Sequence, residues 1–590
     1  MDFFSILTMV GGLALFLYGM RVMGDGLSKI SGGKLERILE KLTNNTVKAV
    51  LVGAGVTAVI QSSSATTVMV VGFVNSGIMK LQQAVGIIIG ANVGTTVTAW
   101  ILSLSGIESG GFLLQMLKPS SFSPILAIAG VCMLSFSKKD KQRDAATILV
   151  GFAVLMIGMD IMADPMKELA NVPEFGKVLT MFSNPFLGML AGLCLTALMQ
   201  SSSASVGVLQ VLSRTGSVSC ATAVPVIMGA NIGACISALL SGIGASRDAK
   251  RASLIHLYYN ILKTSLFMIV FYTVDYFVDF AFMEEPISAL GVAVVHSMFN
   301  VAMCLILLPF SKLLVKLVYL TIPESSASAG NVLTEGERER KSLDPRFLDA
   351  PGFALDQCRH VTGVMARMAQ RSIRTAIDLL FSYDEEKAEE VAELENEVDK
   401  FEDELGTYLV KIGSKDLSGN ENRMLTVLLH CIGDFERISD HALNIKEAAD
   451  EMHEKQLEFS EKAVGELQVF SGAVKDILEL SINAFDQDDA EMARMVEPLE
   501  EVIDQLNIDV KKRHVKRLRK GKCTIEMGFI LSDIITDFER VADHCSNIAV
   551  SLLQKGDDFE AHEYLDTLKT GDNMDFQGRV MAFRNKYPLP

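Results

Sequence analysis

Two copies of one polar sequence interrupt the strongly apolar N-terminal half of this chain of 590 residues. They are Gln61-Ser62-Ser63-Ser64 and Gln200-Ser201-Ser202-Ser203, which lie 139 residues apart. An amide and three hydroxyls are unfavourable in lipid, so polar clusters inside apolar segments usually mark a solute site. Serine hydroxyls and the free N–H groups at the start of a broken helix together suit an anion. We therefore expect both clusters to bind a small anion.

Oxygen-bearing side chains near the clusters suit a hard cation such as sodium. They are Gln61, Gln200, Thr66, Ser205, Thr95, Thr96 and Thr98. Two asparagines, Asn92 and Asn231, either line the same site or cap a local helix break, and the sequence leaves both alternatives open. The centre of the cluster-bearing segments contains no Lys or Arg. Because a cation and an anion that bind together partly cancel the cost of dehydrating each, the pattern favours coupled binding.

The same offset of 139 residues relates many other positions of the apolar half. Equivalent pairs include Gly12 and Gly151, Thr57-Ala58 and Thr196-Ala197, and Gly90-Ala91-Asn92 and Gly229-Ala230-Asn231. Serine and glycine often serve only close helix packing in membranes, but two copies in one register favour a functional site. A single gapless offset over roughly 80 residues indicates a duplication.

Apolar segments predict seven membrane-spanning helices. They lie at about 4–23, 82–104, 123–137, 145–165, 220–241, 252–275 and 287–311. The cluster-bearing segments, 49–76 and 187–214, can each be one span or a hairpin that enters the membrane and returns. We favour hairpins, because all the basic connections then lie on the cytoplasmic side: Lys29–Lys48, Lys138–Arg143, Arg247–Arg251 and Lys312–Lys316. The first copy then has three spans, so the two copies are inverted.

We expect an all-α protein, in which a polytopic membrane domain with inverted repeats and re-entrant hairpins precedes a soluble helical bundle. The membrane domain is placed at 1–322, with repeats at about 4–137 and 143–315, followed by a linker at 323–350, the helical domain at 351–560 and a tail at 561–590. The net charge of −17 argues against a nucleic-acid partner. Nine cysteines without Cys-x-x-Cys spacing fit a reducing compartment on the C-terminal side.

Paired carboxylates recur in the C-terminal half. Asp434-Phe-Glu436-Arg recurs as Asp537-Phe-Glu539-Arg 103 residues later, and an earlier Glu-x-x-x-Asp recurs at an offset of 105. Each Glu-x-x-x-Asp places two carboxylates on one helix face, where they repel unless a cation joins them. A solvated acidic face and a multinuclear metal site of unknown metal both stay open. The candidate metal ligands are Glu395, Asp399, Glu436, Asp440, Glu500, Asp504, Glu539 and Asp543.

Two further polar pairs lie in the predicted spans. His256 with Asn260, and His296 with Asn300, are each four residues apart, so each pair shares a helix face. For both pairs we favour hydrogen bonds between helices over direct ligation. The chain shows no nucleophile beside a base, no glycine loop followed by lysine and no histidine metal motif, so we do not expect an enzyme.

The doubled Gln-Ser-Ser-Ser motif, each copy followed by Gly-Ala-Asn-x-Gly, resembles the type II sodium/phosphate cotransporters and their bacterial relatives over roughly residues 4–315. The resemblance implies sodium-coupled movement of inorganic phosphate, with both clusters at hairpin tips around substrate and ions. One departure concerns the second copy. Gly94-Thr95-Thr96-Val97-Thr98 corresponds there to Gly233-Ala234-Cys235-Ile236-Ser237, which has fewer hydroxyls, so the number of sodium ions stays open.

Residues 355–555 or so are similar to PhoU domains, which are paired helical bundles. This resemblance implies metal binding through Glu-x-x-x-Asp and a role in phosphate regulation, by sensing phosphate or gating its flux. The combined hypothesis is a sodium/phosphate cotransporter of the bacterial cytoplasmic membrane, in contact with lipid, whose C-terminal domain is cytoplasmic. The alternative is a membrane-anchored phosphate sensor that binds phosphate without transporting it. The sequence leaves import against export and homodimer formation open.

Overall fold

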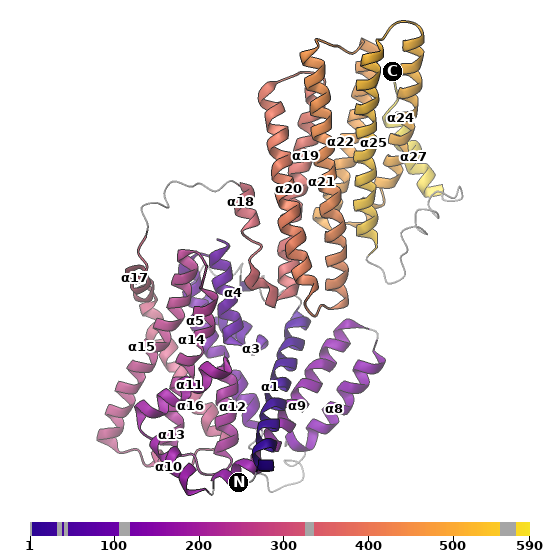
Figure 1. The fold of residues 1–590 in the computed structure, drawn as a ribbon. Helices are drawn as coiled ribbons and strands as arrows, with labels where there is room; N and C mark the ends of the chain where they lie inside the picture. Colours follow the sequence, from indigo (N-terminus) through magenta and orange to yellow (C-terminus); the bar gives the residue numbers. More distant parts are fainter. Residues whose placement is uncertain are drawn as a thin grey trace. The chain divides into compact units, whose positions relative to one another are not determined.

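The computed structural model describes residues 3–31, 38–39, 45–104, 119–137, 139–170, 172–324, 335–554 and 574–590. The chain divides into two compact units. The N-terminal unit comprises Met1–Leu333 with Asp344–Phe353, and the C-terminal unit comprises Thr334–Leu343 with Ala354–Pro590. Each unit is built from helices, and the described residues contain no strand, only an isolated bridge between Ser219 and Pro286 (Figure 1). The expected all-α class is confirmed.

The helices of the N-terminal unit follow the predicted segments closely. They are α1 (Phe3–Ser31), α3 (Thr46–Ile60), α4 (Ser63–Asn75), α5 (Leu81–Gly94), α6 (Thr96–Ser103), α8 (Pro119–Phe136), α9 (Asp140–Ala170), α10 (Pro173–Met181), α11 (Pro185–Met199), α12 (Ser202–Ser213), α13 (Cys220–Gly233), α14 (Cys235–Ser241), α15 (Arg247–Val278), α16 (Ala289–Leu307) and α17 (Ser311–Thr321).

Six stretches in the described ranges are long and apolar enough to cross a membrane. They are Phe3–Ile30, Leu81–Ser103, Lys141–Ala170, Cys220–Ser241, Arg247–Val278 and Ala289–Thr321. They correspond to six of the seven predicted spans. The seventh prediction, at 123–137, coincides with the shorter apolar helix Ser121–Phe136.

Both cluster-bearing segments are hairpins. α3 packs parallel to α5, since Gly86, Gly90 and Gly94 meet Ala49, Val50 and Ala54 in the same order along both helices. α4 runs back to α5 through a short turn. α11 and α13 repeat this arrangement with Gly192 against Val226. Each helix is also too short to span: α3 has 15 residues, about 22 Å of helix against about 30 Å of hydrocarbon. The prediction of hairpins over single spans is confirmed.

The first helices of the two copies, α1 and α9, run antiparallel in close contact. Gly12 packs against Gly158, and Gly19 packs against Gly151, with backbone atoms too near to admit a side chain. These four glycines are two pairs related by the offset of 139. Equivalent helices therefore point in opposite directions, as inverted repeats require.

The C-terminal unit is a set of long helices, with two copies of a three-helix bundle. Its helices are α18 (Glu335–Arg340), α19 (Pro351–Leu379), α20 (Glu385–Gly413), α21 (Gly419–Glu454), α22 (Glu461–Gln487), α23 (Ala490–Ala493), α24 (Val496–Arg519), α25 (Ile525–Leu553) and α27 (Met574–Lys586). A capping box, in which Ser418 and Glu421 exchange hydrogen bonds, starts α21. α21 and α25 pack along each other and join the copies.

Part of each predicted terminal or connecting segment lies outside the described residues. This applies to 325–334 of the expected linker and to 561–573 of the expected tail. The rest of the tail contains helix α27, whose Lys586 pairs with Asp476 of α22 at 2.5 Å. Residues 344–353, which we call the junction segment, contain the 3₁₀ helix η5 (Pro345–Asp349) and pack in the N-terminal unit.

Candidate functional site

The first cluster forms the tip of the α3–α4 hairpin. Gln61 ends α3 with a left-handed backbone conformation (φ 62°), and its N–H donates to the Thr57 carbonyl at 2.8 Å. Ser62 is the N-cap of α4, because its hydroxyl accepts a hydrogen bond from the Ala65 N–H at 3.1 Å. Glutamine thus reverses the chain and serine starts the returning helix.

The second cluster has the same geometry. Gln200 ends α11 with φ 53° and donates to the Thr196 carbonyl at 2.7 Å, while the Ser201 hydroxyl caps α12 at Ala204. A hydrogen bond between side chains closes each hairpin just below its tip. It joins Thr57 to Thr66 at 3.0 Å in the first copy and Thr196 to Ser205 at 2.8 Å in the second.

Each tip leaves a group of donors available. Ser63 and Ser64 occupy the first two positions of α4, where a helix has no internal partner for backbone N–H groups. Ser202 and Ser203 occupy the same positions of α12. Within the described part of the chain, neither the N–H groups nor the hydroxyls of these four serines donate a hydrogen bond. Two N–H groups and two hydroxyls at a helix N-terminus can bind an anion.

One predicted cation ligand of the first copy, Thr98, contacts another, Gln61. The Thr98 hydroxyl, 1% exposed, donates to Gln61 Oε1 at 2.7 Å, and Gln61 Nε2 donates to the Ala58 carbonyl. Thr95 and Thr96 donate to the Ala91 and Val93 carbonyls, at 3.0 Å and 2.7 Å, beside the break between α5 and α6. Their oxygen lone pairs stay available, and an all-oxygen set fits sodium.

The second copy differs at the same place. Cys235, the equivalent of Thr96, donates its thiol to the Asn231 and His256 carbonyls. Ser237, the equivalent of Thr98, makes no hydrogen bond to Gln200 among the described residues. The two copies therefore differ behind the tips in their hydrogen bonds as well as in their number of hydroxyl side chains.

Helices of the two copies contact each other near the tips. α12 of the second hairpin packs against α6 of the first copy, and α4 of the first hairpin packs against α14 of the second. Gln210 on α12 donates to the Ala99 carbonyl on α6 at 2.9 Å. Each hairpin thus contacts the broken span of the opposite repeat.

Asn92 and Asn231 hold a residue that our sequence interpretation missed. Lys263 of α15 is fully buried and donates through Nζ to Asn92 Oδ1 at 2.9 Å and to Asn231 Oδ1 at 3.0 Å. A third bond reaches Asn300 Oδ1 at 2.8 Å. The cluster-bearing segments contain no Lys or Arg at their centre, but α15 supplies a lysine to the neighbouring asparagines. The signal available was a lysine inside a predicted span.

The two His–Asn pairs are only partly as expected. Asn260 and Asn300 donate to the carbonyls of His256 and His296 in their own helices, at 2.8 Å and 3.0 Å. The bond between helices is the one that Asn300 accepts from Lys263. For the imidazole of His296, the described residues offer no hydrogen-bond partner, so the predicted role holds for Asn300 and not for this histidine.

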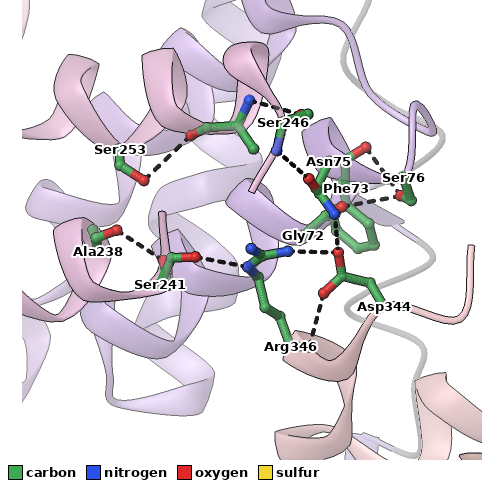
Figure 2. Close-up of polar contacts among 11 residues, drawn as sticks. Gly72, Phe73, Asn75, Ser76, Ala238, Ser241, Ser246, Ser253, Asp344 and Arg346 are labelled. Carbon is green, nitrogen blue, oxygen red and sulfur yellow. Dashed lines mark hydrogen bonds and ion pairs between the residues drawn. The ribbon is translucent and has the colours of Figure 1, made fainter. Parts of the chain in front are cut away.

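The junction segment contacts helices of both copies (Figure 2). The buried carboxylate of Asp344 accepts from Asn75 Nδ2 of α4 at 2.6 Å and pairs with Arg346 at 2.6 Å. Arg346 Nε donates to the Ser241 carbonyl of α14 at 2.9 Å. Phe347, fully buried, contacts Phe73 of α4 with ring centroids 5.2 Å apart. The segment therefore joins α4 of the first hairpin to α14 of the second copy.

The predicted metal ligands gather in two groups in the C-terminal unit. Glu500, Asp504 and Asp543 bring one oxygen each within 4.8 Å of one another, and Glu539 accepts a hydrogen bond from Asn507. In the other copy, burial followed by repulsion from Asp440, Glu402 and Asp399 raises the pKa of Glu436 to about 7. Burial and then Asp440 and Asp399 raise the pKa of Glu395. Clustered oxygens with raised pKa values suit a multivalent cation.

Glu402 belongs to the group around Glu395 and Glu436, although we did not predict it. It lies seven residues after Glu395, and its equivalent by the offset of 105 is Asn507. The group around Glu436 thus has one more carboxylate than the group around Glu500. The copies are also linked by crossed pairs: His441 Nδ1 lies 2.8 Å from Asp537 and His544 Nδ1 lies 2.9 Å from Asp434.

Comparisons with known proteins identify one family in the N-terminal part of the chain and another in the C-terminal part. The family model for Na+/Pi-cotransporters matches residues 15–164 and 162–306, and the PhoU domain model matches residues 363–449 and 467–552. YjbB of Salmonella typhimurium, named as a candidate inorganic phosphate export protein, is 24% identical over 567 residues, which cover 95% of this chain and 100% of that protein.

Other relatives match only part of this chain. The uncharacterized protein YqeW of Bacillus subtilis is 27% identical over 314 residues, which cover 53% of this chain and 96% of that protein. Sodium-dependent phosphate transport protein 2A of Rattus norvegicus is 36% identical over 99 residues, which cover 16% of this chain and 15% of that protein.

Proposed function

Because this chain belongs to the Na+/Pi-cotransporter family and carries a C-terminal PhoU domain, we propose that it is a sodium-coupled secondary transporter of inorganic phosphate. We further propose that it lies in the bacterial cytoplasmic membrane with its PhoU domain in the cytoplasm. The observation that carries the proposal is the pair of equivalent hairpin tips, each with free donors at Ser63 and Ser64 or at Ser202 and Ser203.

Phosphate binding is supported by the chemistry of these tips. A phosphate oxygen accepts up to several hydrogen bonds, and each tip offers backbone N–H groups together with serine hydroxyls at the positive end of a helix. Ser63, Ser202 and Ser203 are buried, so bonds to phosphate there would replace water. We propose that both tips contact one phosphate, and that rocking of the inverted repeats exposes it to either side in turn.

Sodium coupling is supported by the buried side-chain oxygens of the first copy. Thr66, Thr95, Thr96 and Thr98 with Gln61 offer neutral oxygens in a buried region, which is what a hard monovalent cation requires. A bound sodium ion supplies positive charge that offsets the phosphate charge. The poorer set in the second copy, with Cys235 at the equivalent of Thr96, makes the first copy the stronger candidate for an ion.

The direction of transport follows from gradients rather than from residues, since the repeats make both faces equivalent. An inward sodium gradient would drive import, and a high internal phosphate concentration would drive export. The name of the Salmonella relative favours export. We propose that the reaction is transport without chemical change of phosphate, so that the protein is not an enzyme.

The junction segment supports regulation by the PhoU domain. It binds α4 and α14, which belong to opposite repeats, and α19 continues from it into the C-terminal unit. We propose that metal or phosphate status in the PhoU domain changes the hold of this segment on α4 and thereby the transport rate. The carboxylates Glu395, Asp399, Glu436 and Asp440, and Glu500, Asp504, Glu539 and Asp543, are the proposed metal ligands.

Flux of radiolabelled phosphate in proteoliposomes, with and without a sodium gradient, tests the transporter. We expect phosphate accumulation that follows the sodium gradient in the direction imposed. Phosphate binding without flux in either direction would instead support the alternative, a membrane-anchored sensor. Protein-free liposomes, and protein with Ser63→Ala and Ser202→Ala combined, are the controls.

A further inference from the structure

Lys263 is held as a cation by neutral oxygens alone. Its nitrogen contacts three amide oxygens at 2.8–3.0 Å, which matches the three N–H donors of an ammonium, whereas a neutral amine has only two. Tyr259 and Phe299 place their rings 5.2 Å and 5.1 Å from the same nitrogen, which adds cation–π attraction. The ion pairs present among the described residues do not include Lys263, so no carboxylate neutralises it there.

The three amides are fixed with their oxygens toward the lysine. Asn92, Asn231 and Asn300 each use Nδ2 to donate to the carbonyl four residues earlier in their own helix, at 2.8–3.0 Å. Rotation of any one amide would break this bond and would turn an N–H group toward the ammonium. The oxygens therefore form a preorganised cation site that is independent of the lysine side chain.

The site is shared by the two repeats. Asn92 lies on α5 and Asn231 at the equivalent position on α13, while Asn300 comes from α16. Lys263 reaches them from α15, and all four residues are 5% exposed or less. A fixed set of buried, neutral oxygens is the environment that protein sites use for hard cations. Burial of an uncompensated charge is costly, so packing alone does not account for lysine here.

We propose that Asn92, Asn231 and Asn300 form a monovalent-cation site in which the tethered ammonium of Lys263 takes the place of a sodium ion. The protein thereby carries one tethered positive charge between its repeats, which attracts the anionic substrate and does not move with the coupling ions. Only the identity of that anion rests on the proposed function, because the cation site itself is defined without phosphate.

The first test asks whether sodium can replace the ammonium. Full-length wild type, Lys263→Ala and Lys263→Met are purified in detergent without phosphate, and thermal unfolding is measured as sodium chloride replaces N-methyl-D-glucamine chloride at constant ionic strength. Alanine leaves room at the oxygens and methionine fills it. We expect sodium to raise the Tm of Lys263→Ala by about 4 °C more than that of wild type. Lys263→Met should respond as wild type does, and so should Lys250→Ala, an exposed control on the same helix.

An equal sodium response of Lys263→Ala, Lys263→Met and wild type would overturn the proposal. If Lys263→Ala is recovered as a monodisperse protein only in sodium, that result supports it as well. A second pair of variants keeps the lysine and covers failure of Lys263→Ala to fold. Asn300→Asp neutralises the ammonium, whereas Asn300→Ala removes one acceptor and leaves the charge.

For Asn300→Asp and Asn300→Ala, the affinity for inorganic phosphate is measured at one fixed sodium concentration. We expect Asn300→Asp to weaken phosphate binding about tenfold relative to Asn300→Ala, because the tethered charge is then cancelled. Equal affinities of the two variants would contradict a role of that charge. Absence of phosphate flux in wild type would contradict the proposed function and would leave the sodium response of Lys263→Ala unaffected, so the two failures are distinguishable.

Discussion

Thr98 donates a hydrogen bond to Gln61 Oε1 at 2.7 Å across the gap between the first hairpin tip and the broken span α5–α6. The corresponding residues of the second copy, Ser237 and Gln200, make no such bond within the described ranges. The duplicated tips are thus alike in backbone and different in the side chains behind them. This asymmetry suggests that one tip binds ions more strongly than the other.

We predict that Thr98→Val impairs sodium-dependent phosphate uptake and that Ser237→Ala does not. Valine keeps the volume of threonine but leaves Gln61 Oε1 without its donor in a buried place, which costs about 1–3 kcal/mol. The sodium concentration for half-maximal uptake should rise about tenfold in Thr98→Val and change less than about twofold in Ser237→Ala. Equal effects of the two substitutions would show that the asymmetry has no consequence for coupling.

The serine hydroxyls at the two helix starts should contribute to phosphate affinity. We predict that Ser63→Ala and Ser202→Ala each weaken phosphate binding about tenfold, since each removes one hydroxyl donor to an anion. Equilibrium binding of labelled phosphate at saturating sodium measures the effect. Ser217→Ala, an exposed serine in a connection, is the control. Unchanged affinity in both tip variants would refute the site assignment.

Much of the fold of the N-terminal unit was predictable because equivalent residues of the two copies recur at a constant offset in the sequence. The offset between Gln61 and Gln200 identified equivalent tips, and basic connections indicated hairpins, both of which the structure bears out. Lys263 was not predicted, because it lies alone in an apolar span and has no equivalent in the first copy. Glu402 was overlooked since Asn507 breaks the carboxylate repeat there.

The junction segment shows a second reason why sequence alone fell short. Its composition is that of a connector, and nothing in Asp344 or Arg346 indicates that they bind residues such as Asn75 and Ser241, more than a hundred positions away. Such contacts depend on which helix ends the fold brings together. Regular periodicity predicts the elements, but it does not predict irregular contacts between their ends.

We predict that Arg346→Ala removes regulation of transport by metal. The substitution deletes the bonds to Asp344 and to the Ser241 carbonyl, so α4 and α14 are no longer joined through this residue. Initial phosphate flux should rise about twofold or more and should no longer change when a chelator is added. Lys341→Ala, three residues before Asp344 and exposed, should retain the wild-type response. Retention of the chelator response in Arg346→Ala would exclude this route of regulation.

The metal-free protein should lose stability as pH rises. Burial and neighbouring carboxylates raise the pKa of Glu436 to about 7, above its ordinary value, so the folded state binds a proton that the unfolded state releases more readily. The stabilising contribution is complete below the ordinary carboxyl pKa and is lost as pH rises through about 7. With a chelator, the Tm should fall between about pH 5.5 and about pH 8, and less so in Glu436→Gln.

A bound divalent cation should reverse that pH dependence. Deprotonated carboxylates bind metal better, so manganese or magnesium should raise the Tm more at about pH 8 than at about pH 5.5. A Tm that responds to neither pH nor metal, in wild type as in Glu436→Gln, would favour a solvated acidic face over a metal site.

Close packing of the hairpin on the broken span should tolerate no added methyl group at Gly90. A Cβ built there would lie 2.0 Å from the Val50 carbonyl oxygen, and this neighbour is backbone that cannot rotate away. α3 and α5 would have to separate, which would displace the Ser63 tip that α3 supports. We predict that Gly90→Ala destabilises the protein by about 1–3 kcal/mol or more and abolishes transport. Gly11→Ala on α1, where a Cβ meets nothing within 4 Å, should leave Tm and flux unchanged. A stable and active Gly90→Ala protein would show that the hairpin adjusts its position relative to α5, and the rigid pairing of these two helices would have to be abandoned.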